Sequence, residues 1–248
     1  MINPREVPVF VITGFLESGK TTFITNAILS DPKLQSERVL IVACEEGETE
    51  YALYKNAYIH YIEEKEEMQE FIFLELCEKY NPTYVIIEYN AIWGMQVLYN
   101  AVMPDSWRFA QQATIIDGQT FEAYSSNMKN IFADMVRGSS MVVVNRCTRE
   151  DDFKLYKDSI KRSAPRAEIV YMSDEEGILD ILLEDDIPYD LSGDVITVNK
   201  ENYLTWYVDT IDNPERYLGK TVDYIGIALK PAQFRDGYFT VGNEVMTC

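Results

Sequence analysis

One stretch near the amino terminus, residues 9–23, limits the folds open to this chain more than any other. It reads VFVITGFLESGKTTF, an apolar run followed by Gly14 and Gly19, five residues apart, and then by a lysine and two threonines. The apolar run predicts a buried strand, and the following TTFITNAIL predicts a helix with an apolar face. A strand that turns into a helix through a glycine-rich loop is typical of α/β proteins that bind phosphate there.

The spacing from Gly14 to Thr21, G-x-x-x-x-G-K-T, is that of the P-loop. The glycines allow successive N–H groups to point inward, and the helix N-terminus adds a partial positive charge. We expect Lys20 to reach the β- and γ-phosphates of a nucleotide and the Thr21 hydroxyl to ligate Mg²⁺. A chance glycine-rich turn is the alternative, which the flanking strand and helix disfavour. The expected nucleotide-binding residues of the loop are Gly14, Phe15, Leu16, Glu17, Ser18, Gly19, Lys20, Thr21 and Thr22.

Short apolar runs alternate with longer amphipathic stretches through the first two thirds of the chain. Amphipathic segments such as 66–79 predict the helices between the runs. Runs that are apolar throughout indicate strands covered on both faces. The sequence therefore predicts an α/β fold of the P-loop NTPase class, a mainly parallel sheet flanked by helices. The expected strands are 7–13, 38–43, 84–88, 113–117, 141–145 and 168–172.

This pattern ends near residue 172. Residues 173–194 carry nine acidic side chains and no basic one, which indicates a solvated helix and linker. A helix is expected over 200–211, and the strand-like runs 220–229 and 238–247 indicate a small β-rich appendage. We expect a nucleotide-binding domain over 1–176, an acidic linker and helix over 177–213, and a partial β-rich domain over 214–248, cut from a longer native chain.

Composition excludes some classes of function. The net charge of −19 argues against nucleic acid, because binding a polyanion requires clustered Lys and Arg. No apolar run approaches the ~18 residues of a membrane helix, and no secretion signal is evident, so we expect a cytoplasmic protein without membrane contact. The four cysteines lack a CxxC spacing and are expected to be free thiols, and His60 is expected to be a strand residue.

Three further positions at strand ends are candidates for the site. Glu88 ends the run YVIIE, where a Walker B carboxylate lies, and Glu45 follows the run ending at residue 43. Together with Lys20 they are the expected catalytic residues, and with Thr21 they are the expected Mg²⁺ ligands. The alternative for each glutamate is a solvent-facing carboxylate. Asn145 leaves a strand at the carboxyl edge, where α/β sheets bind ligands.

These motifs, taken in order, resemble those of a known family. TGFLESGKTT differs from the family's TGFLGSGKTT only at Glu17. After the second strand CEEG takes the place of the family's NEFG, and EYNA takes the place of its ETSG. Further on, TIIDGQTF matches a vvDa..f segment, and NRCT takes the place of NKxD. The chain resembles the CobW-like branch of the P-loop GTPases, relatives of UreG and HypB, over residues 7 to 172. The resemblance implies a slow GTPase switch in metal-centre assembly or metal trafficking, with Asn145 and Arg146 beside the guanine.

The resemblance also implies GTP as the ligand, with ATP left open, a client metalloprotein and a homodimer across the nucleotide. The chain departs from the family at several points. The metal-binding CxCC is absent, Ala91 replaces a switch glycine, and Thr148 replaces the aspartate that reads guanine, for which Glu150 or Asp151 could substitute through a shifted loop.

The last residues, MTC, resemble the start of an MTCC segment found in a small domain of such GTPases. Cys248 is therefore a candidate soft-metal ligand, for zinc or another transition metal. Two other functions remain open from the sequence: a scaffold that binds nucleotide without hydrolysis, and a small-molecule kinase. The kinase is disfavoured because residues 100–112, with only Arg108, offer little of an arginine-bearing lid.

Overall fold

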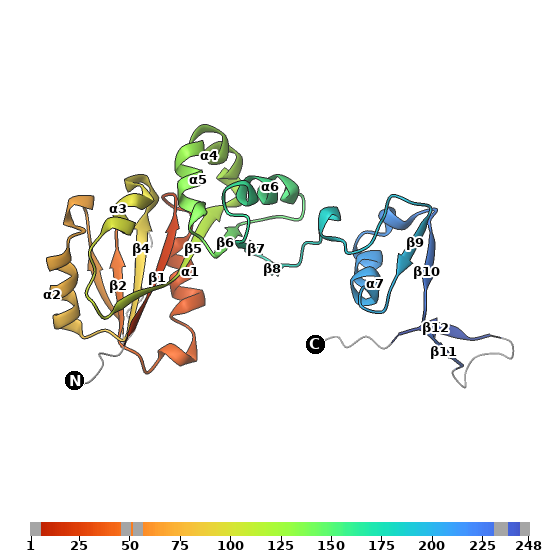
Figure 1. Ribbon diagram of the computed structural model, residues 1–248, viewed down its shortest axis with the longest axis horizontal. Coiled ribbons are helices and arrows are strands. Elements are labelled where there is room, and N and C mark those ends of the chain that lie inside the picture. The colour runs from red at the N-terminus through yellow and green to blue at the C-terminus, as the bar shows by residue number, and fades with distance from the viewer. Residues whose placement is uncertain (1–5, 46–50, 52–56, 231–237, 244–248) are drawn as a thin grey trace. The chain divides into compact units, whose positions relative to one another are not determined.

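The computed structural model describes residues 6–45, 51, 57–230 and 238–243 (Figure 1). The chain divides into two compact units, residues 1–180 and 181–248. Cys248, the candidate soft-metal ligand, lies outside the described residues. Among the helices in the described ranges, none has both the length and the apolar character needed to cross a membrane.

The first unit is built on an eight-stranded sheet, which confirms the predicted mainly parallel α/β fold. Each neighbouring pair is parallel except the last, β7 and β8, which is antiparallel. Across the sheet the order is β3 (Ala57–Tyr61), β2 (Val39–Ala43), β4 (Tyr84–Asn90), β1 (Val7–Gly14), β5 (Trp107–Asp117), β6 (Met141–Asn145), β7 (Glu168–Ser173) and β8 (Gly177–Leu179).

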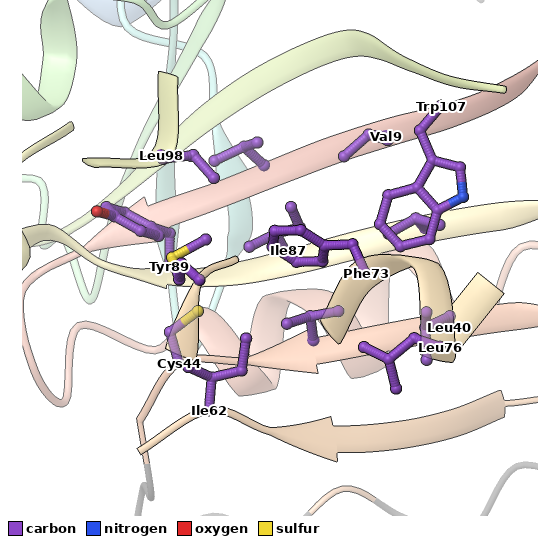
Figure 2. Packing of buried hydrophobic residues seen from close by; sticks show 14 of the residues in the cluster. Val9, Leu40, Cys44, Ile62, Phe73, Leu76, Ile87, Tyr89, Leu98 and Trp107 are labelled. Atoms are coloured by element: carbon purple, nitrogen blue, oxygen red, sulfur yellow. The ribbon is translucent and has the colours of Figure 1, made fainter. Parts of the chain in front are cut away.

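Both faces of the central strands are buried, which explains their apolar sequences. In β1, Val9 and Val11 belong to one core cluster and Ile12 to a second cluster on the opposite face, as the period of two in a strand requires. The first cluster includes Phe73 and Trp107, whose ring centroids lie 5.8 Å apart (Figure 2). These packed faces hold β1 rigidly in the middle of the sheet.

The helices connect successive strands. Helix α1 is short and continues directly as a π-helix, whose Ile24 packs on the second cluster, while α2 and α3 pack on the first. The helix expected over 66–79 begins later, because Met68 leaves helical geometry after a 3₁₀ turn. The bounds are α1 (Lys20–Phe23), the π-helix (Ile24–Ile28), α2 (Glu70–Tyr80), α3 (Met95–Asn100), α4 (Phe121–Asn127), α5 (Lys129–Arg137) and α6 (Phe153–Ser163).

The order in which the chain connects the strands determines where the site lies. Strand β1 lies between β4 and β5, and the chain leaves it toward β2 on one side before returning to β5 on the other. Ligands of open α/β sheets bind at such a switch point, beyond the carboxyl ends of the strands. The register aligns Gly14 with Asn90, and Asp117 with Asn145, so the motifs of four strands meet at this edge.

The stretch 173–194 differs from the helix and linker expected there. Strand β8 (Gly177–Leu179) folds back on β7, and the helical part is one 3₁₀ turn, Glu184–Asp186. Gly177 has a φ of 77°, which a glycine adopts without strain and which turns the chain back. Charge density identifies an exposed segment but does not distinguish a helix from a short edge strand.

The second unit contains small strand pairs and a helix, and it includes part of the stretch expected as a linker. Strands β9 (Val195–Val198) and β10 (Thr221–Tyr224) are parallel, and helix α7 (Tyr203–Asp212) connects them. Strands β11 (Ile227–Leu229) and β12 (Thr240–Gly242) form an antiparallel pair. The expected strand 220–229 is therefore two strands. The unit's core holds Ile196, Val198 and Tyr203.

Candidate nucleotide-binding site

The P-loop follows β1 and curls as the sequence predicts. Glycine is required at position 14, because a Cβ there would lie 2.4 Å from the backbone oxygen of Ile115. Gly19 has a φ of 92°, and a Cβ on it would lie 2.5 Å from Asn145 Nδ2. The Ser18 amide donates to the Phe15 oxygen at 3.2 Å and closes the turn. At the start of α1 the first amides have no partner within the helix and are free to bind anions.

The other loop residues divide into buried and exposed side chains. Phe15 is buried and stacks on Tyr124 of α4, with ring centroids 4.2 Å apart, so it anchors the loop. Leu16, Glu17 and Thr22 are exposed. Glu17 has a φ of 59°, a left-handed conformation that costs a non-glycine residue on the order of 1 kcal/mol.

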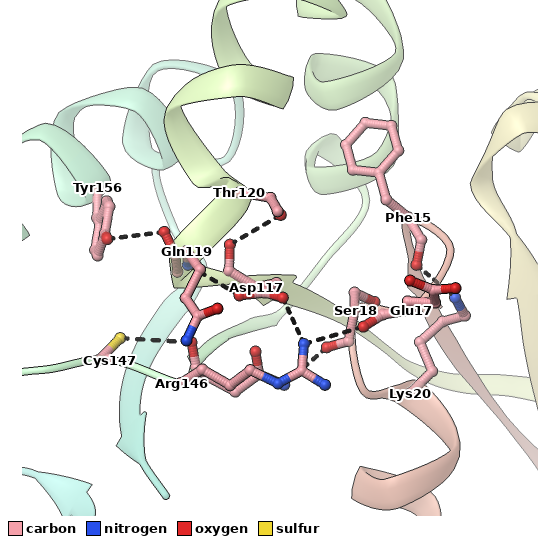
Figure 3. Close-up of polar contacts among 12 residues, drawn as sticks. Phe15, Glu17, Ser18, Lys20, Asp117, Gln119, Thr120, Arg146, Cys147 and Tyr156 are labelled. Atoms are coloured by element: carbon pink, nitrogen blue, oxygen red, sulfur yellow. Dashed lines mark hydrogen bonds and ion pairs between the residues drawn. The ribbon is translucent and has the colours of Figure 1, made fainter. Parts of the chain in front are cut away.

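Lys20 points into the site, where its ammonium group has polar partners (Figure 3). Only 2% of the residue is exposed. Its Nζ donates to the Phe15 oxygen at 2.8 Å and to the Gly14 oxygen at 3.3 Å, and it forms an ion pair with Glu45. The loop therefore folds around the ammonium group, as a phosphate-binding lysine requires.

Thr21 and Glu88 lie together beside this lysine. The Thr21 hydroxyl donates to Glu88 Oε1 at 2.7 Å, and the buried Tyr51 hydroxyl donates to Glu88 Oε2. Burial, followed by the charge of Glu88, raises the pKa of Tyr51, so this hydroxyl remains a donor. Tyr51 was not expected at the site, and the sequence around it gives no periodic signal that would have identified it.

The oxygens gathered here fit a magnesium ion. Thr21 and Glu88 supply a hydroxyl and a carboxylate, and Oε2 of Glu45 is buried without a hydrogen-bond partner among the described residues. Mg²⁺ prefers such oxygen ligands and is usually held by one or two protein groups together with substrate phosphates. The described ranges contain no cluster of three or more His, Cys, Asp or Glu that could hold a metal ion.

The segment after β6 is tied to the P-loop. Asn145 Nδ2 donates to the Ser18 oxygen at 2.7 Å. Arg146 Nη1 donates to the Glu17 oxygen at 3.1 Å and pairs with Asp117 (Figure 3). The structure thus brings both residues predicted beside the base into contact with the loop. Asp117, at the end of β5, was not among the residues expected at the site.

The residues that depart from the family pattern take ordinary conformations. Asp151 Oδ2 accepts from the amide of Thr148, the residue that replaces the family's aspartate, at 2.8 Å, whereas Glu150 is exposed. Ala91 begins a 3₁₀ turn without a positive φ, and the next positive φ belongs to Gly94. Cys44, Cys77 and Cys147 are free thiols, as predicted.

This fold and this loop define an α/β protein of the P-loop nucleotide-binding class. A model of the CobW/HypB/UreG nucleotide-binding domain matches residues 8–171, and the chain belongs to that family. A second family, the DUF1980 C-terminal domain, matches residues 184–248. No curated protein sequence matches the chain.

The chain is similar to solved structures at low sequence identity. The Zn(II)-bound YjiA GTPase from E. coli is 15% identical with a TM-score of 0.50, and the match covers 75% of this chain and 64% of YjiA. The hydrogenase maturation factor HypB from Archaeoglobus fulgidus is 17% identical with a TM-score of 0.47, covering 70% of this chain and 84% of HypB.

Proposed function

We propose that the chain binds GTP with Mg²⁺ at the P-loop, hydrolyses it slowly and acts as a switch in metal-centre assembly or metal trafficking. The observation that carries this proposal is the loop itself, folded around the buried Lys20, with Thr21 and Glu88 in contact beside it. A chance glycine-rich turn would not gather a buried cation, a hydroxyl and a carboxylate at one point.

The phosphates would be held by the loop amides and Lys20. Their binding stabilises the negative charge that spreads over the phosphoryl oxygens during transfer. Mg²⁺, ligated by Thr21 and Glu88, would neutralise further charge on these oxygens. Because the chain has a net charge of −19, these local groups must supply the whole attraction for the anion.

Hydrolysis needs a group that orients the attacking water. Glu88 is engaged with Thr21 and Tyr51, which leaves Glu45 as the carboxylate for this role. Arg146 contacts the loop but is already paired with Asp117, so it does not serve as an arginine finger. We therefore expect slow turnover until a partner protein supplies a cation.

The base and the metal cargo belong to the same proposal. Asn145 and Arg146 at the loop, with the Asp151 carboxylate nearby, support guanine over adenine. Membership of the CobW/HypB/UreG family supports a metal-related role, and one structural neighbour, YjiA, is described as a Zn(II)-bound GTPase. The proposal also includes a zinc or nickel cargo, a client metalloprotein that receives it, and a homodimer that forms across the nucleotide.

We rank the small-molecule kinase lower because of the position of Arg108. Arg108 pairs in register with Pro8 at the start of β1, whereas the P-loop follows the end of that strand. This arginine therefore lies at the opposite edge of the sheet from the phosphates and cannot cover them.

Isothermal titration of the wild-type protein and Lys20→Ala with GTP and ATP, with and without Mg²⁺, tests the proposal. We expect the wild type to bind GTP more tightly than ATP, and Lys20→Ala to lose at least about 100-fold in affinity. Equal binding by both proteins would refute the site. Release of phosphate by the wild type but not by Lys20→Ala separates a hydrolase from a scaffold that only binds.

A further inference from the structure

The ammonium group of Lys20 has no free donor in the structure. It carries three N–H donors, and it has three partners: the Phe15 oxygen, the Gly14 oxygen and the Glu45 carboxylate. A nucleotide phosphate can reach this lysine only if one of these partners leaves. Two of them are backbone oxygens of the loop and cannot leave without unfolding it.

Glu45 is the partner that can leave. It stands two residues beyond the end of β2, and the preceding residue, Cys44, fixes that end by donating its amide to the Glu88 oxygen at 2.8 Å. One carboxylate oxygen contacts Lys20, while the other is buried without a hydrogen-bond partner among the described residues. Rotation of the side chain off Lys20 would break one ion pair and expose the orphan oxygen to water, which is compatible with the water-orienting role proposed for this carboxylate.

The geometry leaves this carboxylate only half satisfied, because one oxygen pairs with Lys20 while the other has no hydrogen-bond partner among the described residues. An unpartnered buried oxygen also costs on the order of 1–3 kcal/mol. The Glu45 carboxylate can therefore be displaced from Lys20 by an anion that pairs with the lysine better, such as a nucleotide phosphate.

We propose that Glu45 is a built-in competitor of the nucleotide, which occupies Lys20 in the empty protein where the terminal phosphate binds in the complex. The inference rests on the proposed function, since it requires that the loop bind a nucleoside triphosphate. Glu88 does not share this role, because its two oxygens accept from Thr21 and Tyr51 and do not contact Lys20.

The competition sets the affinity and the rate of association. When only a fraction of the protein has an open site, the apparent Kd rises by the reciprocal of that fraction. A closed state ten times more populated than the open one thus weakens binding about tenfold, and the loss lies in the association rate. Glu45 in this way determines how much nucleotide is needed to load the protein.

The test is the binding of a non-hydrolysable GTP analogue to wild type and to Glu45→Gln, followed by titration and stopped-flow mixing. We expect Glu45→Gln to bind about tenfold more tightly, through a faster association rate and an unchanged dissociation rate. Glu45→Asp, which keeps the charge but shortens the side chain by one methylene, should shift in the same direction. Glu75→Gln is the matched control, because it removes an exposed glutamate charge from α2, away from the loop and from the partners of Lys20.

The outcomes separate this inference from the proposed function. Binding by the wild type with equal or weaker binding by both Glu45 variants, or a gain confined to the dissociation rate, would overturn the competition and leave the nucleotide site intact. Failure of the wild type and of both variants to bind would overturn the proposed function as well. Thermal unfolding of each variant confirms that it is folded before binding is measured.

Discussion

At the scale of single residues, the buried Lys20 is the side chain on which the proposed site depends most. It is a cation with 2% exposure in a chain of net charge −19, and its polar partners are loop oxygens and one carboxylate. Burying an ammonium group is costly unless it is paired. The structure meets this requirement with Glu45, and the proposed nucleotide meets it with a phosphate.

Glu17 is expected to weaken phosphate binding. It adds an exposed negative charge to the loop at a position with φ of 59°, where glycine is favoured. Glu17→Gln should therefore raise the affinity for a triphosphate about two- to fivefold at low ionic strength. Because the charge is exposed, the gain should shrink in about 0.5 M salt.

Titration calorimetry at two salt concentrations measures this effect. A gain that persists unchanged at high salt would show that the mutation acts through loop geometry and not through charge.

Part of the site was predictable from the sequence because it lies in a local motif. The contacts between residues far apart in the sequence were not predictable. Lys20, Thr21 and Glu88 were expected at the phosphates because spacing and strand ends identify them, and the structure places them together. The contacts of Tyr51 and Asp117 depend on pairings across 37 and 29 residues, for which a single sequence carries no spacing rule.

At the scale of elements, the strand–loop–helix unit was predictable because each part has its own signal. The strands β1, β2, β4 and β6 fall close to the predicted ranges, since they are apolar on both faces. Strands β8 and β9 were not singled out, because three or four residues are too few to show a period. The π-helix after α1 was read as part of one regular helix, whose apolar spacing it nearly shares.

Gly14 should be essential to the P-loop because a side chain at this position has no room, and not because the loop needs a flexible backbone there. In Gly14→Ala the new Cβ would meet the Ile115 backbone oxygen, so we expect a loss of about 1–3 kcal/mol in the free energy of unfolding and loss of nucleotide binding. Gly94→Ala is the matched control: its φ is 80°, but its Cβ would meet nothing within 4 Å. It should lose a similar amount of stability and retain nucleotide binding.

Urea unfolding and GTP titration of both variants test this contrast. If Gly14→Ala bound nucleotide as well as Gly94→Ala does, the close approach to β5 would not be what shapes the loop.

At the scale of the whole molecule, alternation of strands and helices predicted the class of the first unit, but not the strand order. The order depends on which pairs of strands meet, and an equally alternating sequence is compatible with several orders. The second unit is less apparent from sequence because its core is small. It is stabilised in part by a polar cluster around Asp209, which accepts from Arg216, Tyr217 and Asn213.

Asp209→Asn is expected to destabilise the second unit without changing nucleotide affinity. Asp209 is 1% exposed, and its three partners all belong to residues 181–248. Removing its charge leaves Arg216 without its partner, at a cost of about 3 kcal/mol. The exposed Asp212→Asn on the same helix should change little.

Calorimetric unfolding together with GTP titration measures both effects in the full chain. A fall in nucleotide affinity in Asp209→Asn alone would contradict the assignment of the binding site to the first unit.

The most direct test of the account is a crystal structure of the protein with Mg²⁺ and a non-hydrolysable GTP analogue. The account predicts that the phosphates lie inside the loop from Gly14 to Thr21. The terminal phosphate should contact Lys20, and the Glu45 carboxylate should no longer pair with this lysine. A nucleotide bound elsewhere, with Lys20 and Glu45 still paired, would contradict it.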